Sequence, residues 1–175
     1  MDDKIKFKIG DKVIYPNQGI SVIEEIIEKS IGDQTAKCYH LRVLSNCSSV
    51  LVPISNVHEV GLRKLSSRSD INSLFGFFED DNINFNSDWK ERYKIHENMM
   101  RTGLLFDIAS VLKNLYYLSL IKPLSFREKK MMEKAKFLLA SEISEVNNCK
   151  IKYAEEKIES ILYNTFKSKI PKQNF

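Results

Sequence analysis

The spacing of hydrophobic positions along the chain changes character near residue 68. Between residues 7 and 63 the apolar residues form short runs, closed by turn signals such as the one at residues 16–19, PNQG. Residues 38–43 alternate between an apolar and a more polar set, which is the period of a half-buried strand. Beyond residue 68 the period becomes helical. The pattern predicts an α+β protein, in which a small, strongly bent antiparallel β-barrel precedes an all-helical bundle.

Start and stop signals divide the helical part and place its expected caps. Ser87 or Asp88 can cap the helix that carries Trp89, and Ser125 with Glu128 matches a capping box. The expected helices are a short apolar one at residues 74–78, one from residue 89 to Gly103, one over 104–121 stopped by Pro123, a long one from residue 126, and an amphipathic one over 150–168.

Composition and charge bound the function without fixing it. The hydrophobic share of 43% and charged share of 29% are those of an ordinary soluble protein. Residues 1–80 hold 10 Lys and Arg against 11 Asp and Glu, a net charge of −1, whereas residues 81–175 hold 17 against 12, a net of +5. An anionic partner is therefore expected on the second half.

The chain shows few signs of catalytic or membrane chemistry. It lacks a glycine-rich phosphate loop and a hydrolase or metalloprotease motif. Cys38, His40, Cys47 and His58 lack the short spacing of a zinc site, so we expect no metal and no cofactor. A charged N-terminus and three cysteines without paired spacing favour a cytoplasmic protein with reduced thiols and no membrane segment. We do not expect an enzyme.

The segment SDWKERYK, residues 87–94, holds the only tryptophan, with Lys90, Arg92 and Lys94 around it. Two interpretations stay open from these residues alone. Trp89 can anchor a helical core, which is the usual place of a tryptophan. Alternatively, it faces a partner that favours both positive charge and stacking.

Several segments resemble, in order, those of one family of bacterial transcription regulators, the CarD/CdnL family. The resemblance spans residues 7 to about 145, and its first motif is shared with transcription-repair coupling factors. The matching segments are FKIGDKVIYPNQG at residues 7–19, Val52-Pro53 with Asn56, Val60 to Arg63, Trp89 to Lys94, and Leu124-Ser125 with Glu128-Lys129 through Ala135-Lys136.

The resemblance implies a division of labour between two domains. Residues 1–66 would form a Tudor-like domain that binds the β subunit of RNA polymerase, and residues 67–175 a helical DNA-binding domain. In the family, the tryptophan wedges into the minor groove of promoter double-stranded DNA at the upstream edge of the transcription bubble, with weak sequence preference, and so stabilises the open complex. A monomer, associated with the nucleoid through polymerase, is expected.

The same resemblance assigns site residues. The expected DNA-binding residues are Trp89, Lys90, Arg92, Lys94, Arg127, Lys129 and Lys130. The expected polymerase-binding residues are Lys29, Leu51, Val52 and Pro53. Cations would hold phosphates while the indole ring supplies a shape-selective contact. For individual residues the alternatives are a surface ion pair between Arg92 and Asp88, and plain solvation of Lys129 and Lys130.

The chain departs from the family pattern at some of these positions. Lys29 and Leu51 stand where well-known relatives present arginine, so polymerase contact at Leu51 would rest on backbone pairing and apolar packing. Residues 116–119, YYLS, offer no cation, and Glu91 replaces an arginine of some relatives. A weaker grip on DNA is expected. The remaining alternative is a protein–protein adaptor that docks a partner through its β module and has no direct DNA role.

Overall fold

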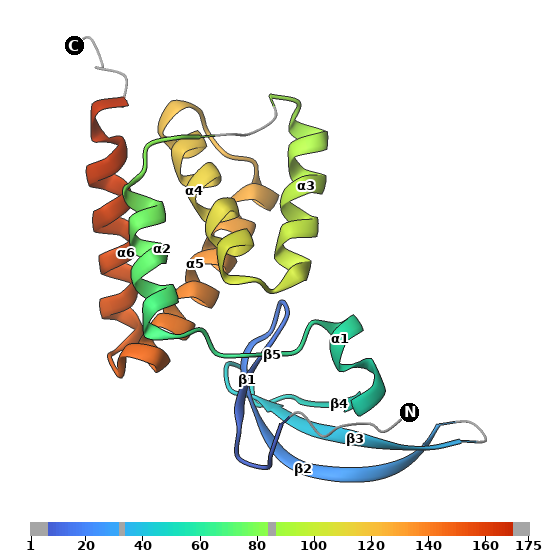
Figure 1. The fold of residues 1–175 in the computed structure, drawn as a ribbon. Coiled ribbons are helices and arrows are strands. Elements are labelled where there is room, and N and C mark those ends of the chain that lie inside the picture. The colour runs from blue at the N-terminus through green and yellow to red at the C-terminus, as the bar shows by residue number, and fades with distance from the viewer. Residues whose placement is uncertain (1–6, 32–33, 84–86, 170–175) are drawn as a thin grey trace. The chain divides into compact units, whose positions relative to one another are not determined.

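The computed structural model describes residues 7–31, 34–83 and 87–169. The chain divides into two compact units, Met1–Leu65 and Ser66–Phe175 (Figure 1). The first unit contains all the strands and the second contains all the long helices among the described residues. This order of elements confirms the α+β prediction.

The first unit is an antiparallel sheet of five strands in the order β4-β3-β2-β1-β5. Its register shifts between Ile23 and Glu25, a β-bulge that bends the long second strand. Strands β4 and β5 form the two edges. The elements are β1 (Lys12–Tyr15), β2 (Gly19–Ile31), β3 (Gln34–Val43), β4 (Ser49–Pro53), the 3-10 turn η1 (Ile54–Asn56), the short helix α1 (Val57–Val60) and β5 (Arg63–Lys64).

The alternation predicted for residues 38–43 sets the core of this unit. Tyr39, Leu41 and Val43 are buried, as expected from their period of two. The Tyr39 hydroxyl accepts a hydrogen bond of 3.1 Å from the Phe7 amide, and the two rings meet edge to face at 5.8 Å. The buried hydroxyl is therefore satisfied, and it ties the residues before β1 to the sheet.

The second unit is a bundle of helices around an apolar core. Its core residues come from all five long helices, for example Phe78, Met100, Leu115, Leu139 and Phe166. The helices are α2 (Arg68–Glu79), α3 (Trp89–Thr102), α4 (Leu105–Ile121), α5 (Phe126–Asn147) and α6 (Ile151–Phe166), followed by the 3-10 turn η2 (Lys167–Lys169).

The helix caps expected from the sequence are present at the predicted residues. Asp88 caps α3, Ser125 and Glu128 form the capping box of α5, and Gly103 follows α3 with φ 68°. Helix α2 is longer than predicted. It begins at a second capping box, made by Ser67 and Asp70, rather than at residue 74.

Candidate nucleic-acid interface

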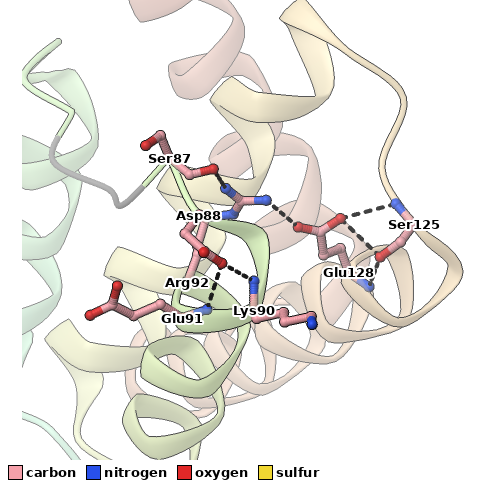
Figure 2. Close-up of polar contacts among 7 residues, drawn as sticks. All are labelled: Ser87, Asp88, Lys90, Glu91, Arg92, Ser125 and Glu128. Atoms are coloured by element: carbon pink, nitrogen blue, oxygen red, sulfur yellow. Dashed lines mark hydrogen bonds and ion pairs between the residues drawn. The ribbon is translucent and has the colours of Figure 1, made fainter.

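Trp89 is the first residue of α3 and lies outside the helical core. Its relative exposure is 63%, and the Lys90 ammonium lies 5.6 Å from the centre of its ring. The Asp88 carboxylate accepts the amides of Lys90 at 2.7 Å and Glu91 at 3.2 Å, which fixes the first turn (Figure 2). The structure thus selects the second interpretation of the ring, that of a surface residue beside positive charge.

Arg92 lies one turn further along α3, and its place corrects the expected phosphate contact. Its side chain is only 3% exposed, and its Nη2 donates to Glu128 Oε1 at 2.9 Å. Its Nη1 donates to the Ser87 carbonyl at 3.3 Å. The guanidinium thus turns toward Glu128 of α5 (Figure 2). In this geometry Arg92 is a structural residue.

Glu128 is the partner that sequence reasoning did not assign to Arg92. Its Oε2 accepts from the Ser125 amide at 3.0 Å and from the Ser125 hydroxyl at 2.9 Å, while Oε1 accepts from Arg92 (Figure 2). Burial alone would raise the pKa of Glu128, but the hydrogen bonds from Arg92 and Ser125 outweigh it and hold this pKa below its ordinary value. One carboxylate therefore completes the cap of α5 and ties α5 to α3.

His96 completes a buried polar cluster with Arg92 and Glu128, and it too was missed from the sequence. Its exposure is 2%. Burial and, to a lesser extent, the Arg92 charge lower the pKa of His96 to about 4, with the Glu128 charge opposing them. The imidazole is therefore neutral near pH 7, and the cluster carries one positive and one negative charge.

The other expected DNA-binding cations remain at the surface. Lys90, Lys94, Arg127, Lys129 and Lys130 are all exposed. Arg127, Lys129 and Lys130 follow the Ser125 cap of α5, while the carboxylate of Glu128, which completes that cap, points inward. The structure thus leaves five of the six predicted cations able to meet an anionic partner.

Sequence reasoning also missed Phe126, the first residue of α5. Its exposure of 70% is the highest among the large hydrophobic residues that the structure describes, and the Lys130 ammonium lies 4.6 Å from its ring centre. Its position was the available signal: Phe126 directly follows the Ser125 cap, so it lies before the helix turns that pack into the core and can stay exposed.

The four residues expected to bind polymerase occupy different positions in the sheet. Leu51 and Pro53 are half-buried on the edge strand β4, whereas the Val52 side chain is buried in the core. Strand alternation points the Val52 side chain into the core, where it is not available to a partner. Lys29 is exposed on β2 and pairs with Ala36 of β3. The pairing of β4 with β3 ends at Cys38, so Lys29 lies opposite a part of β3 that β4 does not reach.

Neither a metal-binding cluster nor a membrane-spanning helix is found in the described parts of the chain. No group of three or more His, Cys, Asp or Glu side chains comes together there in a way that could hold a metal ion. No helix there has the length and apolarity needed to cross a membrane.

The fold and the surface together define a two-part protein, with an N-terminal β module and a helical module that presents an aromatic ring among cations. Residues 7–66 match the family model for the CarD-like/TRCF RID domain, and residues 73–159 match that for the CarD C-terminal domain. A Bacillus subtilis (strain 168) protein named "Putative transcription factor YdeB" is 29% identical over 137 residues, which are 78% of this chain and 90% of that protein. The chain belongs to the CarD family.

Replacing Arg92 by Met will destabilise the helical unit by about 3 kcal/mol, because it leaves the Glu128 carboxylate buried without its charged partner. Lys94→Met removes an exposed cation from the same helix and will change the free energy of unfolding by less than about 0.5 kcal/mol. Urea unfolding followed by helical circular dichroism measures both. Equal stabilities for the two variants would contradict the structural role of Arg92.

The helical unit will lose stability as the pH falls from 6.5 toward 4. In this range the unfolded chain protonates His96, whose ordinary pKa is 6.5, whereas the folded state resists protonation until about pH 4. Glu128 adds a loss only below its ordinary pKa of 4.5, because its folded pKa is depressed. His96 is the single histidine of residues 66–175, so His96→Leu will flatten the dependence between pH 6.5 and 4.5. A flat wild-type profile in urea unfolding would refute the assignment.

Proposed function

We propose that this protein regulates transcription initiation by binding the RNA polymerase β subunit through its β module and promoter DNA through its helical unit, so that the open complex is stabilised. The observation that carries the proposal is the position of Trp89, exposed at the start of α3 with Lys90 beside its ring. Family membership supports it, since the family is one of transcription regulators.

An exposed indole at this place suits a distorted DNA step better than a regular duplex. The ring presents a large apolar surface to water, which becomes favourable once it is covered. At the edge of a melted bubble the minor groove is widened and the bases are partly unstacked, so a wedge gains contacts that closed duplex does not provide. Lys90 and Lys94 would hold the neighbouring phosphates without reading the base sequence.

The edge strand β4 suits the polymerase contact. The Val43 amide donates to the Ser48 carbonyl, and hydrogen-bonded pairs alternate along an antiparallel ladder. This alternation directs the backbone groups of Val50 and Val52 toward β3 and those of Ser49 and Leu51 away from it. A strand of the β subunit could then pair with the outward groups, as in strand addition.

This geometry reduces the importance of the missing arginines. At Leu51 the proposed contact consists of backbone pairing and apolar packing, which do not require a guanidinium. Once the β module is docked, it raises the local concentration of the helical unit near the promoter, so a modest intrinsic affinity for DNA is sufficient. We propose that the protein acts as a monomer in the cytoplasm and without catalytic groups.

Leu51→Pro will weaken binding to the polymerase β subunit by about tenfold, because it removes one outward amide while the inward hydrogen bonds of β4 are kept. Leu51→Ala removes the side chain and keeps the amide, so it separates the two contributions. Affinity for the isolated β subunit is the measurement, with circular dichroism as the folding control. If Leu51→Pro folds and binds as tightly as wild type, strand addition at β4 is wrong.

Trp89→Ala will shorten the lifetime of the open complex by about tenfold relative to the wild-type protein on a promoter with an unstable bubble. The measurement uses cognate RNA polymerase and dissociation under competitor. Tyr153→Ala removes another exposed aromatic, on α6, and will act like wild type. A wild-type protein that binds polymerase but leaves the lifetime unchanged would instead favour a protein–protein adaptor.

A further inference from the structure

The start of α5 presents a second exposed aromatic ring, to which the proposed function gives no role. Phe126 is more exposed than Trp89, at 70% against 63%. It occupies the same position in its helix as Trp89 does in α3, the first residue after the cap. Covering an exposed phenyl ring with a partner removes its apolar surface from water, which favours binding.

The charges around Phe126 favour an anionic partner. Arg127, Lys129 and Lys130 are exposed, and the Lys130 ammonium lies 4.6 Å from the ring centre. The single carboxylate of this turn, Glu128, is turned inward, with both oxygens engaged by Arg92 and Ser125. The surface of the turn therefore combines a flat apolar ring with three cations.

The ring also sits on a fixed platform close to the start of α3. The capping box holds the first turn of α5, and the Arg92–Glu128 ion pair joins that turn to the first turn of α3 (Figure 2). Trp89 lies three residues before Arg92, and Phe126 lies two residues before Glu128, so each aromatic residue is within one helical turn of the ion-pair residue on its own helix.

We infer that Phe126 is a second stacking residue of the DNA-binding surface and takes an unstacked nucleobase at the edge of the transcription bubble. The inference rests on the proposed function and extends it to a residue and a ligand. Phosphates alone would be satisfied by the three cations, whereas the ring offers a π-face, to which any base can stack without sequence preference. Lys129 and Lys130 hold the backbone that carries this base.

The test uses the full-length protein, cognate polymerase and a promoter that carries 2-aminopurine, a fluorescent adenine analogue, at an unpaired position of the upstream bubble edge. Stacking on a ring quenches this fluorophore. Four proteins are compared: wild type, Phe126→Ala, Phe126→Tyr and Trp89→Ala. Open-complex lifetime and fluorescence are both measured, and unfolding curves check that the exposed substitutions preserve the fold.

Phe126→Ala will shorten the lifetime by about fivefold or more and lose quenching at one or more edge positions, whereas Phe126→Tyr will behave like wild type. A shorter lifetime with unchanged fluorescence at every edge position would overturn the inference in favour of a contact between Phe126 and polymerase. A Phe126→Ala protein that matches wild type while Trp89→Ala is impaired would overturn the inference and leave the proposed function intact. Failure of the wild-type protein to affect either readout would overturn both.

Discussion

The buried ion pair between Arg92 and Glu128 is the interaction on which the candidate interface depends. Removing two charges from water is costly, and the cost is offset only when their remaining hydrogen-bonding capacity is satisfied. Here the carboxylate caps α5 through Ser125 while it binds the guanidinium of α3. The same contact joins the first turns of the two helices that carry Trp89 and Phe126.

This pairing also determines which charges remain outside. It removes Glu128 from the surface at the start of α5, where three exposed cations, Arg127, Lys129 and Lys130, flank it in sequence. It removes Arg92 from the surface of α3 as well, at the cost of one cation. The surface of the first turn of α5 is therefore more positive than its sequence suggests, and the surface of the first turn of α3 is less positive than its sequence suggests.

The limits of sequence reasoning follow from the range of each interaction. The caps at Asp88 and Ser125 depend on residues within one turn, so local patterns predicted them correctly. The cap at Ser67 was missed because its third helical position holds Asp70 rather than the glutamate of the usual pattern. Arg92 looked like a phosphate ligand because its partner is 36 residues away, and only tertiary packing brings the two together. The sequence alone could not predict the exposure of Trp89 either, because a residue at a helix start can face the core or the solvent.

On the proposed function, the surface binds DNA by stacking as well as by charge. Each phosphate neutralised by a cation releases counterions, which makes binding fall steeply as salt increases. Stacking and wedge contacts release few, so affinity contributed by Trp89 and Phe126 on the proposed function persists as salt rises. On the proposed function, DNA contact then depends on unstacked bases as well as on phosphates, and only a melted promoter presents unstacked bases.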